Sequence, residues 1–211
     1  MVTDQQILNE VQYHAMETPN NGASMATELW SIDEVINILN DKVNRFVSEV
    51  KHTLSIGSMA TSVGVATYDL NTIDTAMVDI FRVAWLTTFG ISYELQRSDQ
   101  FPEDMLNTEW YTTPATPLTY TVANIPNMQI DIMPPPITAG SLNVIYSSIG
   151  SALSNTGVTV PIIDDLTPYI KWGVLADMFN KDGPAHDAQR AAYCEVRFNE
   201  GIAMAKMLSG G

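Results

Sequence analysis

The chain has 211 residues, of which 45% are hydrophobic, and its formal net charge at pH 7 is −14, with a sequence pI near 4.3. This composition is typical of a globular protein with a core of its own and excludes a disordered chain. The ten basic residues are scattered, which excludes tight wrapping of nucleic acid and disfavours a membrane surface, because both need clustered Lys and Arg.

The chain has one cysteine, Cys194, so no intrachain disulfide is expected. The first residues show no basic segment followed by an apolar core, which is the pattern of a signal peptide. The apolar run over residues 78–89 is interrupted by Asp79 and Arg82 and is too short to span a membrane. We therefore expect a protein that is made in a cytoplasm and has no membrane partner.

The N-terminal part of the chain predicts two helices separated by a loop. Residues 3–16 carry apolar side chains at helical spacing and form the first. Ser31 begins the clearest helix, since Ser31 and Glu34 form a capping box, and its apolar stripe continues to Leu54. Residues 55–65 are small and polar, and we expect a loop or a frayed helix end there.

The middle of the chain predicts strands, because apolar and polar residues alternate there with a period of two. After the second strand, residues 98–110 predict a short helix or an irregular turn, and residues 147–157 have the composition of a flexible linker. The predicted strands cover residues 79–86, 92–96, 118–122, 128–132 and 142–146.

The C-terminal part predicts a helical hairpin. Apolar residues from Ile170 to Met178 fall on one helix face, Asp182 and Gly183 supply a turn, and a second helix runs to Leu208, with Pro184 in its first turn. The second helix is rich in small residues, which would let the two helices approach closely.

Helices at both ends therefore flank a block of strands. We predict an α+β fold, in which a helical bundle made from both chain ends carries an inserted antiparallel β-rich middle. Residues 1–211 then form a single domain, which is helical over 1–65 and 158–211 and β-rich over 66–157.

The sequence offers little that predicts catalysis. His14, His52 and His186 are far apart and have no metal-ligand spacing, and no nucleophile-elbow, Walker or dinucleotide motif is present. Cys194 falls on a packed helix face and is expected to be a small buried hydrophobe. The tryptophans at positions 30, 85, 110 and 172 are expected in the core, with an interface anchor as the sharper alternative.

One acidic group leaves an alternative open. Asp164 and Asp165, together with His186, could hold a hard cation and make the protein a metal-dependent hydrolase. Asp164 and Asp165 also suit the start of a helix, which is the interpretation we favour. We therefore expect no enzyme, no cofactor and no metal site.

The order of these features resembles the head-to-tail adaptor proteins of tailed bacteriophages, which are also called neck or connector proteins. The resemblance covers most of the chain. The segments that carry it are Leu29-Trp30-Ser31-Ile32-Asp33-Glu34, Arg82-Val83-Ala84-Trp85, Tyr93-Glu94-Leu95, Ile130-Asp131-Ile132-Met133-Pro134-Pro135-Pro136, Gly140-Ser141-Leu142-Asn143-Val144-Ile145-Tyr146, Ile163-Asp164-Asp165, Tyr169-Ile170-Lys171-Trp172-Gly173 and Arg197-Phe198-Asn199-Glu200-Gly201. The run of three prolines departs from the family, where two separated prolines are expected.

The resemblance implies a virion structural protein located in the neck and assembled in the host cytoplasm. It implies a ring of copies, usually twelve, between the portal protein and the tail or nozzle proteins, with the genome DNA passing through the channel without specific binding. The family supplies no catalytic residues. Besides the hydrolase, a generic acidic adaptor for another protein partner remains the alternative.

We place the contact with the portal at the C-terminal end of the last helix. This end finishes with exposed-looking apolar residues and mobile Ser-Gly-Gly composition. The predicted portal-interface residues are Met204, Lys206, Met207 and Leu208.

Overall fold

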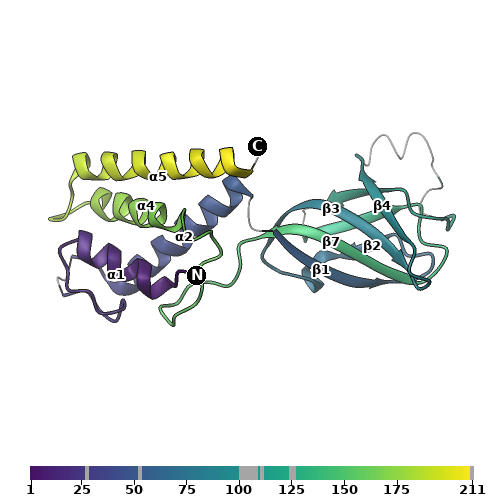
Figure 1. Ribbon diagram of the computed structural model, residues 1–211, viewed down its shortest axis with the longest axis horizontal. Helices are drawn as coiled ribbons and strands as arrows, with labels where there is room; N and C mark the ends of the chain where they lie inside the picture. Colours follow the sequence, from purple (N-terminus) through teal and green to yellow (C-terminus); the bar gives the residue numbers. More distant parts are fainter. Residues whose placement is uncertain (27–28, 52–53, 100–108, 110–111, 124–126, 210–211) are drawn as a thin grey trace. The chain divides into compact units, whose positions relative to one another are not determined.

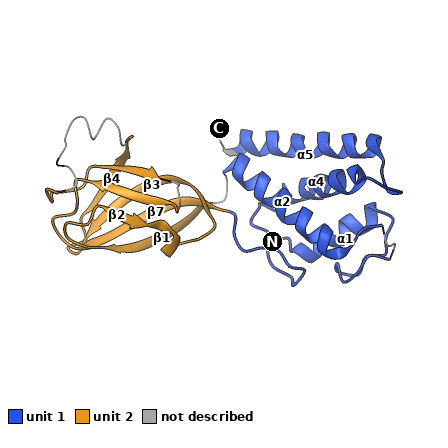
Figure 2. Cartoon of the chain, turned by 180° about the vertical axis from the view of Figure 1, so that it is seen from behind, with its two compact units in different colours: residues 1–53, 149–211 blue, residues 54–148 orange. Residues whose placement is uncertain are grey.

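The computed structural model describes residues 1–26, 29–51, 54–99, 109, 112–123 and 127–209. The chain divides into two compact units: Met1–Thr53 together with Ile149–Gly211, and Leu54–Ser148 (Figure 2). The first unit holds the named helices and the second holds the strands (Figure 1). We call them the helical unit and the strand unit.

The helical unit is organised around one buried helix. Its helices are α1 (Asp4–His14), α2 (Ile32–Val50), α4 (Thr167–Asn180) and α5 (Ala188–Ser209). Helix α4 packs against each of the other three. The core combines side chains from all four helices, among them Leu8, Leu39, Ile170 and Phe198, each at most 1% exposed. None of the helices in the described residues is both long enough and apolar enough to cross a bilayer.

Helix α2 begins where the sequence predicts and ends earlier. The Ser31 hydroxyl accepts a hydrogen bond from the Glu34 amide at 3.2 Å, which confirms Ser31 as the N-cap. At the other end, Lys51 adopts a left-handed conformation with φ of 52° and closes the helix. The prediction that this helix continues to Leu54 is wrong, because Leu54 already begins a strand.

The strand unit forms a seven-stranded sheet in the order β1-β7-β3-β4-β5-β6-β2. Its inward side chains, including Val83, Trp85, Ile130 and Val144, make a second hydrophobic core. The strands are β1 (Leu54–Thr61), β2 (Thr67–Asp69), β3 (Met77–Thr87), β4 (Ser92–Arg97), β5 (Thr119–Ala123), β6 (Gln129–Met133) and β7 (Gly140–Ser148), with a 3₁₀ turn η1 at Leu70–Thr72.

The predicted fold class is wrong. The strands do not form an antiparallel block, because β4 and β5 pair in parallel and the sheet is mixed. A parallel pair needs a crossover connection of about a dozen residues or more, and Ser98–Leu118 between β4 and β5 is long enough to provide it. The predicted helical bundle from both chain ends is not formed either; α1, α2 and α5 each pack against α4. The fold is an α+β arrangement of a helical unit and a mixed sheet.

Three local predictions also fail. Residues 55–65, expected as a loop, contain β1, which is held by eight pairs with β7 from Leu54↔Ser147 to Thr61↔Gly140. Short strand β2 was not predicted. Helix α5 begins at Ala188, so Pro184 lies in the preceding turn. The helix expected over 98–110, together with His52 and Trp110, falls mostly outside the described residues.

Candidate functional site

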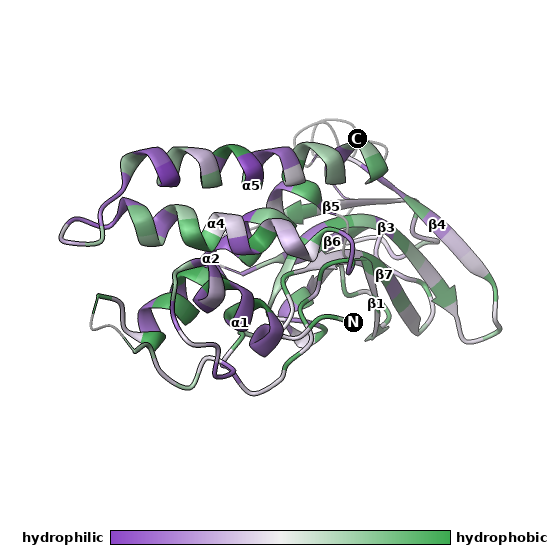
Figure 3. Cartoon of the chain, turned by 60° about the vertical axis from the view of Figure 1, so that its left-hand side comes forward, coloured by the Kyte–Doolittle hydropathy of each residue, from purple (hydrophilic) through white to green (hydrophobic). Residues whose placement is uncertain are grey.

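The C-terminal turns of α5 present the residues predicted to contact the portal. Met204, Met207 and Leu208 are 45%, 80% and 65% exposed, whereas Ala205 between them is buried against the core. Hydrophobic residues occur along the length of α5 (Figure 3). The end of α5 therefore offers apolar side chains to a partner without disturbing its own packing.

Lys206 has a different role in the structure from its neighbours. Its Nζ donates to Glu49 Oε2 at 3.0 Å and so ties the end of α5 to the end of α2. Hydrogen bonds from Lys206 and then from Arg45 lower the pKa of the Glu49 carboxyl. We infer that Lys206 positions the exposed apolar residues, because a fixed helix end loses less entropy when it binds.

A second surface of the helical unit is aromatic. Trp172 of α4 lies between His14 of α1, at 5.0 Å between ring centroids, and Tyr193 of α5, at 5.8 Å with an edge-on geometry. Tyr13 and Met16, at the end of α1, are 70% and 80% exposed. Together with Lys171, Arg190 and Arg197 these residues form what we call the aromatic groove.

The rim of the aromatic groove carries three cations, each paired with a carboxylate: Lys171 with Glu10, Arg190 with Asp187 and Arg197 with Glu200. Lys171 pairs with Glu10 at 2.8 Å and lies 5.4 Å from the Trp172 ring centroid. Arg197 donates from Nε to the Tyr193 hydroxyl at 3.1 Å and stacks on that ring. Arg190 lies over the Phe179 ring at 5.7 Å. Three of the ten basic residues of a strongly acidic chain therefore line one surface.

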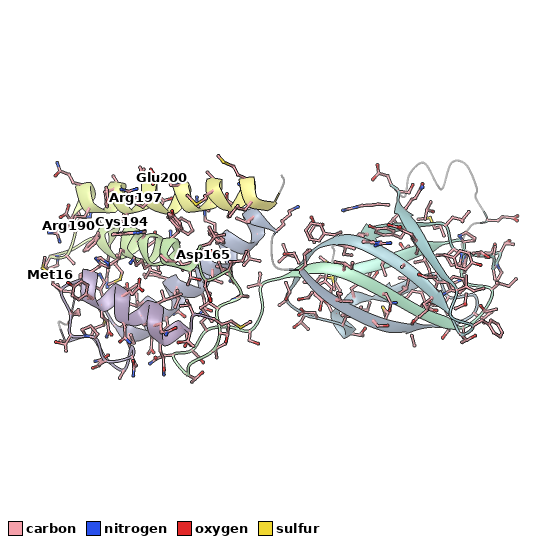
Figure 4. All side chains as sticks on the ribbon, viewed as in Figure 1. Met16, Asp165, Arg190, Cys194, Arg197 and Glu200 are labelled. Atoms are coloured by element: carbon pink, nitrogen blue, oxygen red, sulfur yellow. The ribbon has the colours of Figure 1, made fainter. Side chains whose placement is uncertain are left out.

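The aromatic groove contains two depressions. One has a volume of about 380 Å³ and is lined by Asp165, Trp172, Tyr193 and Arg197. The other is smaller, about 190 Å³, and its lining includes His14, Met16 and Arg190. Figure 4 labels Met16, Arg190 and Arg197, which come from the end of α1 and from α5. We call the smaller depression the Met16 pocket.

Two groups beside the groove, partly exposed His14 and buried Cys194, have shifted pKa values. Burial, and then the positive charge of Lys171, lowers the pKa of His14. Burial raises the pKa of the Cys194 thiol, which is 3% exposed and lines the Met16 pocket. Both shifts favour the neutral forms of these side chains near pH 7, so the floor of the groove is uncharged while its rim consists of ion pairs.

Tyr, Trp, Arg and Met are the residue types that contribute most at protein interfaces. Their arrangement here is suited to binding another protein. Sequence analysis did not find the groove, because Tyr13 and Tyr193 are separated by nearly the whole chain. The only signal available in the sequence was Trp172, for which an interface anchor was the alternative to core packing.

A family model for the SU10 adaptor protein matches residues 5–210. The chain belongs to the SU10 adaptor family. No curated protein matches the chain. The family match confirms the resemblance to phage head-to-tail adaptors, and it makes this protein a structural adaptor of bacteriophage and a component of the virion that associates with other virion proteins.

The alternative metal site of this adaptor is not assembled. Asp165 precedes α4 and His186 follows it, and a helix of 14 residues separates them by about 20 Å. Asp164 accepts the Val2 amide at 2.9 Å and pairs with the terminal ammonium, which together lower its pKa. No group of three or more His, Cys, Asp or Glu side chains with metal-binding geometry occurs among the residues that the structure describes.

The strand unit of the adaptor carries many more acidic than basic residues. The strand unit contains two basic residues, Arg82 and Arg97, which pair with Glu94 at 2.9 Å and Asp79 at 3.6 Å. The acidic residues of this unit number nine in the sequence: Asp69, Asp74, Asp79, Glu94, Asp99, Glu103, Asp104, Glu109 and Asp131.

Proposed function

We propose that this adaptor forms a closed ring between the portal and the tail, in the neck of the phage particle, and encloses the channel through which the genome passes. The match to an adaptor family over residues 5–210 carries the proposal. The partners are further copies of the chain, twelve in the usual ring, the portal protein, and tail or nozzle proteins. We infer a structural role without catalysis, a single adaptor domain of residues 1–211, and assembly in the host cytoplasm.

Electrostatics supports a channel that does not hold DNA. Phosphates are bound by clustered Lys and Arg, and a surface with excess carboxylates repels them. With a net charge of −14 and nine acidic against two basic residues in the strand unit, this chain has the charge needed for an acidic lumen. Identical acidic copies repel one another, so their contacts must be apolar or locally paired.

The C-terminal end of α5 is our proposed contact with the portal. Met204, Met207 and Leu208 are exposed there, and Lys206 anchors the helix end to Glu49. A partner that covers three such side chains would gain about 1.5 kcal/mol or more from each that becomes fully buried.

The test replaces Met204, Met207 and Leu208 with serine together and images the resulting particles by electron microscopy. We expect heads that lack the adaptor and lose DNA, because the apolar contact is removed while the buried Ala205 and the Lys206–Glu49 pair stay. Val196→Ser is the matched control, since Val196 is 57% exposed on the same helix but lies away from its end. Normal particles from the triple variant would reject the docking assignment.

The acidic channel has its own test. Purified adaptor should show no tight binding to double-stranded DNA in a filter-binding assay at physiological salt. Tight binding would contradict a lumen that lets DNA slide.

A further inference from the structure

Strand β1 is an edge of the sheet whose outer side has no partner strand among the described residues. It pairs with β7 in one unbroken register, from Leu54↔Ser147 to Thr61↔Gly140, and it stands last in the strand order (Figure 1). In an antiparallel pair, alternate residues direct both their N–H and their C=O groups away from the partner strand. Alternate residues of β1 therefore present backbone donors and acceptors outward, and no described residue forms a backbone hydrogen bond with them.

The two edges of the sheet differ in how they are protected. Strand β2 at the opposite edge has three residues and ends at Asp69, and short length and charge are usual means by which an edge avoids pairing with another chain. Strand β1 has eight residues and lacks these means. Its register has no bulge, and it contains no charge and no proline, since it reads Leu-Ser-Ile-Gly-Ser-Met-Ala-Thr. An edge of this kind is a template for another strand.

The chain around β1 is uncharged as well. Residues 52–68 contain no Asp, Glu, Lys or Arg, and neither does β7. Two carboxylates approach β7 from other elements. Burial, and then the charge of Asp74, raises the pKa of Tyr146, so Asp74 lies near the inner face of β7. Asp79 lies on β3, on the side of β7 away from β1, and pairs with Arg97 at 3.6 Å. Two acidic copies therefore meet less repulsion along β1 than elsewhere on the strand unit.

The side chains on the outer face of β1 are ordered by size. Exposure alternates along the strand, and the outward residues are Leu54, Ile56, Ser58 and Ala60, with Leu54 58% and Ile56 78% exposed. The two large side chains come first and the two small ones last. A second copy that runs antiparallel reverses this order, so a two-fold axis at Gly57 places each Leu54 opposite Ala60 and each Ile56 opposite Ser58. Every cross-strand pair on this face then joins a large side chain to a small one.

The inner face of β1 fits the same alignment. Met59 packs against the second core and would lie opposite Ser55 of the other copy, which is again a large residue opposite a small one. Gly57 would lie opposite itself at the axis. A Cβ added at Gly57 would lie 2.1 Å from Ile73 Cγ2, so the glycine leaves room for Ile73 beneath the strand.

We propose that two copies of the adaptor join along β1 into a symmetric antiparallel dimer, with one sheet continuous across both strand units. The contact is isologous, since the same surface is used by both copies. The size order of β1 selects a second copy as the partner, because one sequence supplies both halves of the large-to-small pairs. A two-fold contact closes on two copies and does not extend around a ring. The dimer is therefore a state of the adaptor before assembly, and the inference does not rest on the proposed ring.

The test mixes two full-length variants, Leu54→Cys and Ala60→Cys, under mild oxidation. Residues directly opposite in an antiparallel pair have Cα atoms about 4.5–5.5 Å apart, which a disulfide can bridge. We expect a disulfide-linked dimer in which mass spectrometry joins position 54 to position 60. Each variant alone is the matched control, because the two copies of position 54 would lie about 20 Å apart along the strands. The native Cys194 is 3% exposed and should stay reduced.

A charge substitution tests the same contact without a cross-linker. Wild type should sediment with twice the 23.2 kDa mass of one chain in analytical ultracentrifugation. Ile56→Lys should lower the association constant about tenfold or more, because it places two lysines close to the two-fold axis on an edge strand. Phe81→Lys adds the same charge to β3, which β7 separates from β1, and should leave the association constant within about twofold.

Several results would overturn the proposal. Disulfide formation in the single variants as strong as in the mixture would indicate parallel strands and reject the two-fold alignment. A monomeric wild type at about 100 μM, or a dimer that Ile56→Lys leaves intact, would reject pairing through β1. A monomer whose β1 amides become protected from hydrogen exchange only in assembled particles would assign the edge to another virion protein, which also rejects the dimer. These results leave the proposed ring standing, and particles that assemble without the adaptor would reject the ring.

Discussion

Met16 shows how a single residue of this chain is placed for contact with a partner. Its backbone leaves α1 with a φ of 62°, a left-handed conformation that costs roughly 1 kcal/mol or more for a residue with a bulky side chain. The amide still donates to the Tyr13 carbonyl at 3.1 Å, so the turn is closed. The side chain gains no burial in return, since it is 80% exposed at the rim of the aromatic groove.

His14 should make the stability of the helical unit depend on pH. Burial and Lys171 lower its pKa in the folded protein, so the unfolded chain binds more protons once the pH falls below about 6.5, the usual pKa of histidine. The free energy of unfolding should therefore decrease as the pH is lowered below about 6.5. The decrease should level off once the pH is below the lowered pKa of His14 in the folded protein.

The measurement is denaturant unfolding of wild type and His14→Gln at about pH 7 and about pH 5. We expect the variant to lose less stability than wild type between these two values. His186→Gln, which changes an exposed histidine in the turn after α4, is the control and should behave as wild type does. Identical pH profiles for all three proteins would exclude His14 as the cause.

At the scale of elements, α4 and α5 approach closely through glycines. A Cβ added at Gly173 would lie 2.8 Å from the Phe198 ring, and one added at Gly201 would lie 2.4 Å from Tyr169 Cβ and Cγ. These two positions confirm the expectation that small residues let the two helices approach. They also set the position of Tyr169 and Phe198 between the helices.

Gly201→Ala should destabilise the protein by about 1–3 kcal/mol, because the added methyl group overpacks the contact with Tyr169. A loss of stability would identify overpacking as the cause, since alanine in a helix interior is otherwise favoured over glycine by about 1 kcal/mol. Thermal unfolding measures the effect. Ala203→Ser, at an exposed position two residues along the same helix, should change stability little; a gain in stability for Gly201→Ala would show that the helices can separate without cost.

The start of α2 depends on one hydroxyl group. Ser31→Ala removes the bond from the Glu34 amide and should lower the free energy of unfolding by about 1 kcal/mol. Ser48→Ala changes the same residue type at an exposed position inside α2 and should have little effect or stabilise slightly. The denaturant midpoint of Ser31→Ala should therefore lie below that of Ser48→Ala, and equal midpoints would mean that Ser31 does not cap the helix.

At the scale of the whole molecule, charge limits association. Copies with a net charge of −14 repel one another. Raising the salt concentration from about 0.01 M to about 0.15 M shortens the Debye length from about 30 Å to about 8 Å. We expect this change to increase self-association in analytical ultracentrifugation. Association that weakens steadily with salt would mean that attraction between opposite charges on two copies outweighs the repulsion between their net charges.

The sequence by itself determined the features whose causes are local. The N-cap at Ser31 acts within one helical turn, and period-two alternation places the side chains of β4, β5 and β6 on alternate faces whatever their partners are. Net charge, the single cysteine and the ordered motifs of the adaptor family are also properties of the chain as written, so they predicted the kind of protein correctly.

The tertiary structure decided what depends on residues far apart in the chain. Strand β1 carries a weak pattern of serine, glycine and apolar residues and exists because it pairs with β7, with partners from 79 residues apart (Thr61↔Gly140) to 93 apart (Leu54↔Ser147). The parallel pairing of β4 with β5 follows from the connection between them and leaves no mark in either strand. The aromatic groove forms only when Tyr13, Trp172 and Tyr193 come together around α4, because side-chain proximity arises from helix packing and no local period encodes it.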